Sequence, residues 1–496
     1  MEISPEKLAE FNSKYSLGRE EGRGSKHFLR IKVTEGALTS QEALKIAEIA
    51  EKYGKGHLEV TNTQSIQLHW IESKNSIEIF KKLDELGFTT DKCGQAHPQP
   101  KYGDVRNICT CPVTGYDEDE LINVRPFVKE MNNFFIGNED FLDLPGKFKI
   151  SVSGCRNDCA RAQMWDLGLF ALKNEGKIGF GAVVGGSLGP SLPGPQVAKP
   201  LNVFIPQDLV FEATKSMAKI HKKNSSRESK AKARFKWLVD KWGVERVRER
   251  LEDKIGKKLE RLNYQGPKIS DKEHSGVRKQ KDGNYYLNLP LFGGKLSAEE
   301  FRSISHLAQK HGSGELRTTP YQNLIILDTP QEKIKTLRDD LKSLGFKIPT
   351  TNLRWEGIGC SAEFCGKAIK PYPKEAMRKV IRHLEEEFGE ALKGLEIKVR
   401  ATGCPNDCGL RNISNIGFLG KRMEDEELYD LYLGGRLGEG AKFSYPIYKG
   451  LELQEIKHRI TYLVEEAIKE GFGTFDEFLD SHSEEELKKI GIKDDE

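Results

Sequence analysis

Two stretches of this chain repeat the same pattern of apolar and polar positions. Residues 38–68 and 296–326 align without a gap. The second residue of each stretch is polar and is followed three positions later by glutamate, as in Thr39 and Glu42. This capping-box pattern predicts the start of a helix. Alternating apolar positions come next and predict strands. The pattern therefore predicts two ferredoxin-like half-units, each built from alternating helices and strands.

A second repeat lies further along the chain. The heptapeptide SGCRNDC at Ser153–Cys159 matches TGCPNDC at Thr402–Cys408, and the same offset pairs Cys111 with Cys360. It also pairs the glycine loops VGGSLG and LGGRLG. Because several separate matches share one offset, we infer that the chain is internally duplicated.

The duplication predicts an α+β fold with pseudo-twofold symmetry, in which each half joins a small half-unit to a larger α/β unit. A stretch rich in Gly, Lys, Asp and Ser has no apolar period and predicts a linker. Basic and aromatic residues alternate between Lys215 and Arg261 and predict a helical arm, whose basic face is either solvated or a docking surface for an acidic redox partner. The predicted segments are residues 1–95 (N-terminal segment and first half-unit), 96–262 (first larger unit with the arm), 263–284 (linker), 285–350 (second half-unit) and 351–496 (second larger unit).

Composition narrows the class of protein. The chain has 496 residues, of which 37% are hydrophobic and 31% are charged, and no apolar run reaches the roughly 20 residues of a membrane-spanning helix. The N-terminal residues lack the apolar core of a secretory signal. A net charge of +3 gives no reason to expect nucleic acid as a partner. We expect a cytoplasmic protein without a membrane or nucleic-acid partner, in which nine cysteines serve metal binding or catalysis rather than disulfides.

Four cysteines of the second repeat form two pairs. Four residues separate Cys360 from Cys365, and three separate Cys404 from Cys408. Four thiolates are what a 4Fe-4S cluster takes as ligands. Zinc is the main rival, but zinc ribbons usually bind one ion between C-x2-C pairs, and neither pair here has that spacing. Unligated buried cysteines are the third alternative. We expect a 4Fe-4S cluster on these four residues.

The motifs around these cysteines carry a family resemblance. TGCPNDCG with the upstream CSAEFCGKAI resembles the cluster motif of the siroheme-dependent nitrite and sulfite reductases. Further motifs follow in that family's order from about Ser25 into the last helices: VRNICTCPVTG, LPGKFK, SGCRNDC, YQNLII and the two glycine loops. The resemblance implies an oxidoreductase that carries siroheme in its two larger units and a 4Fe-4S cluster, with Cys408 bridging the cluster to the siroheme iron. One departure is the spacing of Cys360 and Cys365, where the family usually has five intervening residues.

The first repeat keeps only part of the cysteine set. Cys111, Cys155 and Cys159 occupy matching positions, but Tyr116 stands where a counterpart of Cys365 would fall. A second cluster would need a substitute ligand, for which the candidates are Cys109 and Cys93. We favour a vestigial site and leave the second cluster as the alternative.

Cations for an anionic substrate come from the first repeat. Lys147 and Lys149 are two residues apart in a predicted strand, so their side chains leave the same face. By resemblance they line the substrate pocket together with Arg106, and they are our catalytic candidates. A further arginine of the family's pocket is replaced here by Thr63.

Siroheme carries eight carboxylates, whose burial requires charge-assisted partners, above all arginine. We expect cofactor contacts from Arg317, Gln322 and Asn323, and from Cys408. Glycine loops let a backbone approach a cofactor closely. The glycines expected to do so are Gly185, Gly186, Gly434 and Gly435. Other arginines near the motifs are Arg156, Arg161, Arg354, Arg400 and Arg411.

The resemblance leaves two substrates. Lys149 is typical of sulfite reductases, whereas CGKAI and PNDCG are closer to nitrite reductases. We expect the six-electron reduction of sulfite to sulfide, with nitrite to ammonia as the alternative and a non-catalytic siroheme protein or precorrin-modifying enzyme as a further one. Because no nucleotide-binding module is visible, we expect ferredoxin or another external protein to donate the electrons.

Overall fold

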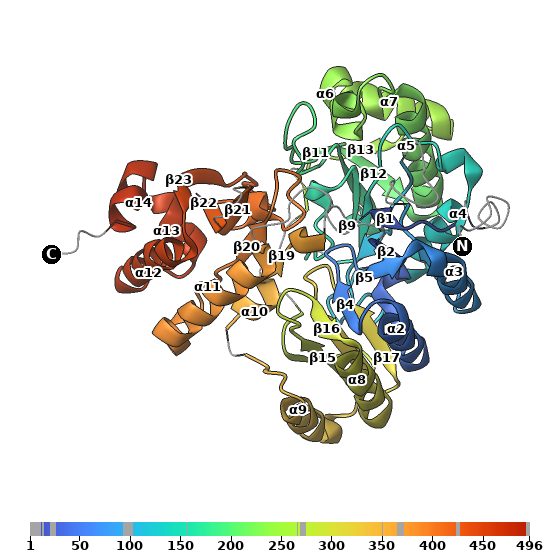
Figure 1. Cartoon of the computed structure of the whole chain (residues 1–496). Helices are drawn as coiled ribbons and strands as arrows, with labels where there is room; N and C mark the ends of the chain where they lie inside the picture. Colours follow the sequence, from blue (N-terminus) through green and yellow to red (C-terminus); the bar gives the residue numbers. More distant parts are fainter. Residues whose placement is uncertain are drawn as a thin grey trace. The chain divides into compact units, whose positions relative to one another are not determined.

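The computed structural model describes residues 11, 14–19, 26–92, 103–155, 157–264, 266–267, 274–349, 351–364, 372–422 and 427–492. The chain divides into two compact units, shown in Figure 1. Unit 1 comprises residues 1–289 and 295–346, and unit 2 comprises residues 290–294 and 347–496. The first predicted half-unit, the first larger unit and most of the second half-unit fall in unit 1, whereas residues 290–294 and 347–350 of that half-unit fall in unit 2 with the second larger unit. Within the described part of the chain, no helix is long and apolar enough to cross a membrane.

The two half-units of unit 1 each contain one sheet. The first sheet runs in the order β1 (Gly18–Arg19), β2 (Lys26–Lys32), β5 (Ile66–Glu72), β4 (His57–Val60) and β16 (Lys295–Ser297), with β6 (Thr89–Thr90) paired to β2. The second runs β14 (Val277–Lys279), β15 (Tyr285–Leu289), β18 (Leu324–Thr329), β17 (Glu315–Thr318) and β3 (Ala37–Thr39). Each half-unit thus gives one edge strand to the other: β16 pairs with β4, and β3 pairs with β17. This exchange ties the two half-units into one unit.

The helices of the half-units repeat at the predicted spacing. They are α2 (Ser40–Tyr53) and α3 (Ser76–Glu85) in the first, and α8 (Ala298–His311) and α9 (Ile334–Ser343) in the second. Both predicted capping boxes are present, since Thr39 and Ser297 accept hydrogen bonds from the backbone N–H groups of Glu42 and Glu300. The helices α2 and α8 pack on each other, side by side in Figure 1. Local sequence signals therefore fix both helix starts.

The larger sheet of unit 1 carries the first cysteine motif. Its order is β7 (Cys109–Thr110), β8 (Ile150–Ser153), β9 (Leu167–Asn174), β10 (Lys177–Val184), β12 (Val203–Pro206) and β13 (Glu260–Arg261), with β11 (Lys199–Pro200) beside β10. The helices are α4 (Arg125–Phe135), α5 (Val210–Asn224), α6 (Phe235–Trp242) and α7 (Val244–Ile255). The predicted arm forms α5 to α7, and its apolar residues, such as Phe235 and Leu238, pack into the core. Basic residues such as Lys223 and Lys241 remain exposed.

Unit 2 repeats this sheet. Its order is β19 (Ile358–Gly359), β20 (Val399–Thr402), β21 (Ile416–Arg422), β22 (Glu427–Leu433) and β23 (Tyr445–Leu451). The first three strands are parallel and the fourth is antiparallel, as in β7 to β10. The helices are α10 (Leu353–Glu356), α11 (Pro373–Phe388), α12 (Leu453–Lys469), α13 (Phe475–Ser481) and α14 (Glu484–Ile490). The common strand order confirms the duplication inferred from the sequence.

The predicted linker, residues 263–284, is only partly described. Its last part contains His274 and the strand β14, which pairs with β15. This segment is therefore integrated into unit 1 rather than extended between the halves. The five-segment division of the chain remains a proposal about its repeating parts.

Candidate functional site

The cysteine loops of unit 2 lie at one edge of its sheet. Cys360 follows β19, and Cys404 follows β20. Because these strands are parallel neighbours, their carboxyl ends meet at the same edge. The backbone N–H of Cys360 donates a hydrogen bond to the carbonyl of Ala401 at 3.1 Å, which holds the two loops together. Cys365 lies outside the described residues.

Polar groups around Cys360 suit a metal-bound thiolate. The N–H of Gly403 donates to Cys360 Sγ at 3.2 Å, and the hydroxyl of Thr402 lies 3.7 Å from the same atom. Burial, and then the neighbouring Cys408, raise the pKa of the Cys360 thiol well above its ordinary value. Binding iron to this thiol would therefore release a proton.

The C-x3-C turn is shaped by its own residues. Asp407 accepts hydrogen bonds from the backbone N–H groups of Arg411 and Asn412, which begins the short 3₁₀ helix Arg411–Ile413. A Cβ on Gly409 would lie 1.9 Å from the carbonyl oxygen of Ala401, so only glycine fits there. Of the described cysteines in this unit, Cys408 is exposed while Cys360 and Cys404 are half-buried. These donors fit a 4Fe-4S cluster with Cys408 on its outer side.

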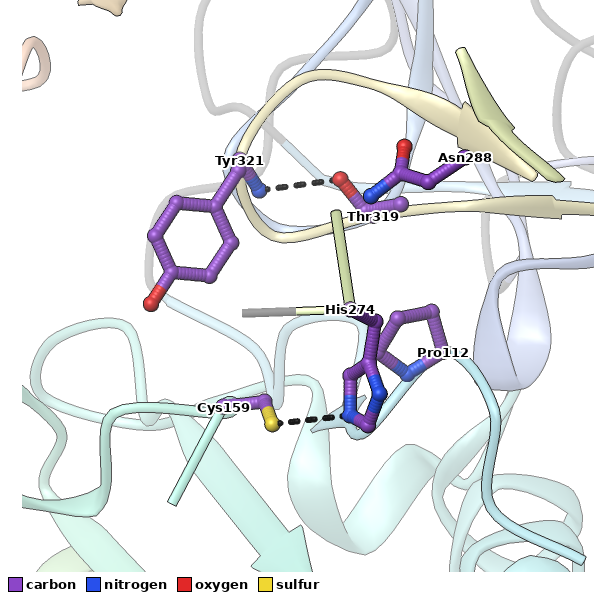
Figure 2. A pocket seen from close by; sticks show the side chains of 6 residues that line it. All are labelled: Pro112, Cys159, His274, Asn288, Thr319 and Tyr321. Atoms are coloured by element: carbon purple, nitrogen blue, oxygen red, sulfur yellow. Dashed lines mark hydrogen bonds between the residues drawn. The ribbon is translucent and has the colours of Figure 1, made fainter. Parts of the chain in front are cut away.

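The first repeat gathers its thiols in the interior of unit 1. Cys111, Cys155 and Cys159 are all buried. Tyr116, at the position matching Cys365, donates its hydroxyl to the carboxylate of Glu315 at 2.9 Å. His274, a lone histidine in the predicted linker, was not singled out from the sequence, yet its ring lies against Cys159 in Figure 2.

The three predicted pocket cations lie on adjoining backbone segments. Val105 forms a parallel bridge with Phe148, and the N–H of Arg106 donates to the Phe148 carbonyl at 2.9 Å. Phe148, which lies between Lys147 and Lys149, is buried in the core. The structure thus brings Arg106 beside both lysines, while their action on a substrate stays a prediction.

Each cation is positioned by neighbours. The Arg106 guanidinium lies 3.4 Å from the carboxylate of Asp104. Burial raises the pKa of Asp91, but the charges of Arg106, Lys32 and Arg30 outweigh it and lower this pKa overall. Lys149 Nζ lies 4.4 Å from the ring centre of Trp165, and its backbone N–H donates to Asp166 at 2.9 Å. These contacts position Arg106 and Lys149 in unit 1.

The turn that carries Thr63 in place of the expected arginine lies next to the Arg106–Asn107 segment. Asn107 Nδ2 donates to the carbonyl of Thr63 at 2.9 Å and to that of Val33 at 3.0 Å. Thr63 is buried and its hydroxyl lies 3.1 Å from that of Thr61. Thr63 therefore sits beside the Arg106–Asn107 segment and contributes no charge to it.

His221 packs against the segment that carries Lys147 and Lys149. Its ring stacks on Phe148 at 5.3 Å, its Nε2–H donates to the Gly146 carbonyl at 2.9 Å, and its Nδ1 accepts from Ser225 at 2.8 Å. Burial lowers the pKa of His221 to about 4. Because an unfolded histidine takes up a proton at about pH 6.5, acidification between pH 6.5 and 4 favours the unfolded chain.

We expect His221→Gln to weaken this acid sensitivity, because glutamine keeps a donor and an acceptor but does not titrate. The native protein should lose up to about 3 kcal/mol of its free energy of unfolding from this group between pH 7 and pH 4. Urea denaturation at the two pH values measures the difference. His306→Gln, on the exposed side of α8, is the matched control and should behave as the native protein. Equal acid sensitivity in both variants would contradict the assignment.

The glycine loops contact the chain itself. The N–H groups of Gly185 and Gly186 donate to the carbonyls of Asp166 and Trp165 at 2.9 and 2.8 Å. Those of Gly434 and Gly435 donate to Asn415 and Ser414 at 3.2 and 2.9 Å. A Cβ on Gly186 would lie 2.4 Å from the Gln163 carbonyl oxygen, and one on Gly435 would lie 2.4 Å from that of Asn412. Internal packing thus already requires glycine in these loops, and a cofactor contact there stays a prediction.

The remaining predicted cofactor residues lie on β17 and in the turn after it. Arg317 is buried and its guanidinium pairs with Glu315 at 3.0 Å. Gln322 adopts a left-handed backbone conformation, with φ of 64°, and Asn323 is fully buried beside it. Gln64 has the same conformation in the matching turn of the first half-unit, with φ of 57°. The structure therefore places these residues in the repeated turn, and their contact with siroheme is still a prediction.

The other arginines differ in how far the protein already satisfies them. Arg354 forms a bidentate pair with Glu385, and Arg400 pairs with Glu356 at 2.8 Å. Within the described residues, Arg400 Nε and Arg411 Nε are buried without a hydrogen-bond partner. Arg156 lies outside the described residues. Arg411 Nε lies 3.8 Å from the carboxylate of Asp407, which leaves Arg400 Nε as the buried guanidinium nitrogen near the C-x3-C turn that suits a carboxylate of a bound cofactor.

Two family models match the chain. The nitrite and sulphite reductase 4Fe-4S domain matches residues 102–259. The nitrite/sulfite reductase ferredoxin-like half domain matches residues 19–86 and 278–344, and this double match confirms the two predicted half-units.

Similar proteins cover most of the chain. An assimilatory ferredoxin-dependent nitrite reductase of Haloferax mediterranei is 31% identical, over 90% of this chain and 80% of that protein. A sulfite reductase [ferredoxin] of Mycobacterium tuberculosis is 29% identical, over 84% and 75%. The structure of the Mycobacterium tuberculosis NirA protein superposes with a TM-score of 0.88, at 26% identity, over 98% of this chain and 92% of that one.

These matches agree with the site. The family carries siroheme and a 4Fe-4S cluster, as predicted, and its members are oxidoreductases. The Haloferax mediterranei protein is more than 30% identical over nine-tenths of this chain. The repeated half-units also match the family model. The chain belongs to the family of nitrite and sulfite reductases.

Proposed function

We propose that this protein reduces sulfite to sulfide, with siroheme and a 4Fe-4S cluster as cofactors and ferredoxin or another external protein as electron donor. The cluster ligands in this proposal are Cys360, Cys365, Cys404 and Cys408, with Cys408 shared with the siroheme iron. Similar proteins are named both nitrite reductases and sulfite reductases, and both groups are named for ferredoxin. The choice of substrate therefore rests on the residues of this chain.

The charge of the pocket is the observation that favours sulfite. Near neutral pH sulfite carries up to two negative charges, whereas nitrite carries one. Arg106, Lys147 and Lys149 supply three cations from adjoining segments, and a cationic cleft attracts the more highly charged anion more strongly. Replacement of the expected arginine by Thr63 removes a fourth charge, which makes Lys149 more important for binding.

The protein's own residues bind the anion and supply protons. The two lysine ammonium groups and the Arg106 guanidinium hold the substrate oxygens, and a lysine ammonium can give a proton to an oxygen that leaves as water. The bound cofactors supply the electrons one at a time. Buried Phe148 fixes the spacing of the two lysines, so that both act on the same small anion.

We expect purified holoprotein with reduced viologen or ferredoxin to form hydrogen sulfide from sulfite, and ammonia from nitrite at an equal or lower rate. Separate steady-state assays give kcat/KM for each anion. Lys149→Asn should lower kcat/KM for sulfite more than for nitrite, because it removes one charge from the pocket. Lys173→Asn, at an exposed position on β9, is the matched control.

A nitrite turnover more than about tenfold above that of sulfite would reverse the proposed order of substrates. An absorption spectrum of the same sample shows whether siroheme is present, through its Soret and far-red bands. Siroheme bands without turnover of either anion would contradict the proposed enzymatic function.

A further inference from the structure

Three segments of unit 1 bring thiols and an imidazole together. Cys111 follows β7, Cys155 and Cys159 follow β8, and His274 precedes β14. His274 Nε2 lies 3.1 Å from Cys111 Sγ and 3.2 Å from Cys159 Sγ. The donor atoms of these three residues all lie within 4.8 Å of one another, and all three residues are buried. Figure 2 shows the His274 ring turned toward Cys159.

Cys155 completes the group. It lies four residues before Cys159 on the loop after β8, and its Sγ lies 3.5 Å from the Asn157 carbonyl oxygen, which Cys159 Sγ approaches at 2.9 Å. His274 Nε2 is a second acceptor within reach of the thiols of Cys111 and Cys159. Three sulfurs and one nitrogen are a donor set that a soft or borderline cation prefers.

The other ring nitrogen of His274 is held as in metal-bound histidines. Nδ1 lies 2.8 Å from the hydroxyl of Tyr286 and 3.4 Å from the carboxylate of Asp117. A histidine that binds a metal usually donates its second N–H to a carboxylate or another acceptor, which fixes the ring's orientation and its tautomer. Here Nδ1–H faces these acceptors, and the Nε2 lone pair faces the sulfurs.

The spacing of the donors favours a single ion. In a tetrahedral zinc site, bonds of about 2.3 Å to sulfur and 2.0–2.1 Å to nitrogen put neighbouring donors roughly 3.5–3.8 Å apart. The nitrogen-to-sulfur distances of 3.1 and 3.2 Å are close to this range. A 4Fe-4S cube would have to fit between the same atoms and needs them further apart. Tyr116, bonded to Glu315, occupies the place of the fourth cluster cysteine.

We propose that Cys111, Cys155, Cys159 and His274 bind one Zn²⁺ ion in a closed structural site, separate from the redox cofactors. Four protein ligands leave no open position for substrate, so the ion is structural rather than catalytic. It joins the loops after β7 and β8 to the segment that leads into β14, inside an apolar cluster that includes Val113 and Ile325. The three thiols lose their protons to solvent when the ion binds, and no electron is transferred.

The test is the metal content of the full-length holoprotein, isolated without chelator. We expect about one zinc per chain by plasma mass spectrometry, and about four acid-labile sulfides. Zinc-edge X-ray absorption should show three sulfur neighbours at about 2.3 Å and one nitrogen at 2.0–2.1 Å. Absence of zinc, or about eight sulfides per chain, would overturn the proposal, the second result in favour of a second cluster.

Two variants of one residue sharpen the test. His274→Ala should lower the zinc content by at least about tenfold, whereas His274→Cys should keep it, because cysteine is also a zinc ligand. Cys109→Ser is the matched control, since Cys109 is buried two residues from Cys111 but lies outside the donor group. Unchanged zinc in His274→Ala would contradict the assignment. If that variant does not fold, the zinc content and the zinc-edge X-ray absorption spectrum of the native protein decide whether the site binds zinc.

Discussion

Replacing Cys408 by serine is expected to lower sulfite and nitrite reduction by at least about a thousandfold. A serine hydroxyl keeps its proton near neutral pH and is a harder ligand than a thiolate, so it would be a poor substitute in the proposed bridge between the cluster and the siroheme iron. Cys408 is also the exposed member of the cysteines described in unit 2, which suits a ligand shared with a second group. Its turn is held by Asp407 and Gly409, so the substitution leaves the local backbone intact.

The measurement combines steady-state turnover with iron and sulfide analysis and a siroheme spectrum. If the sulfide content stays near four per chain while turnover is lost, the bridge itself has failed. If sulfide is lost as well, Cys408 is needed to assemble the cluster, and Cys360→Ser should then behave identically. Cys109→Ser removes a buried thiol elsewhere and serves as the control. A Cys408→Ser protein with full activity would contradict the proposed ligand.

Removing a charge from the proposed substrate pocket is expected to have the second large effect. Lys147→Met is expected to lower kcat/KM by about 10²–10³, the usual effect of losing one group that stabilises charge in a transition state. Methionine keeps the length and flexibility of the side chain, and buried Phe148 still anchors the segment. Loss of stability is therefore not the expected cause.

Substitutions of Arg106 and Lys147 should change different kinetic constants. Arg106→Gln should act chiefly on KM, because a guanidinium always carries its charge and binds rather than donates protons. Lys147→Met should also lower kcat, since it removes a proton donor. The double variant should lose less than the product of the single effects, because both groups act on one anion. Lys173→Met is the control, and equal losses in it and in Lys147→Met would refute the pocket.

Local pattern explains why the starts of α2 and α8 were predictable. The helix α2 begins after Thr39 and α8 after Ser297, and both starts depend on groups within three residues of each other. The capping boxes depend on side chains close together along the chain, so one sequence is enough to find them. Lys147 and Lys149 were predicted to share a face of a strand, but β8 begins at Ile150, so that they share a face stays a prediction.

The glycine loops show where the same reasoning stops. The sequence predicted that Gly186 and Gly435 let a cofactor approach, which stays a prediction; the structure shows that the carbonyl groups of Gln163 and Asn412 also lie close to them. A glycine indicates that another group approaches the backbone closely, but it does not identify that group. The approaching group is known only from tertiary packing, which places the loop after β10 against the turn after β8 and the loop after β22 against the turn after β20.

By itself, the sequence determined the duplication, the helix starts, the cysteine pairs and the residue types that suit an anion, because repeats, caps and ligand spacing are local or periodic. Tertiary structure alone decided that the half-units exchange β3 and β16, that Arg106 lies beside Phe148, and that His274 joins Cys111 and Cys159. These contacts link residues far apart in the chain. They follow from how whole sheets and loops pack, and no local pattern of side chains encodes that packing.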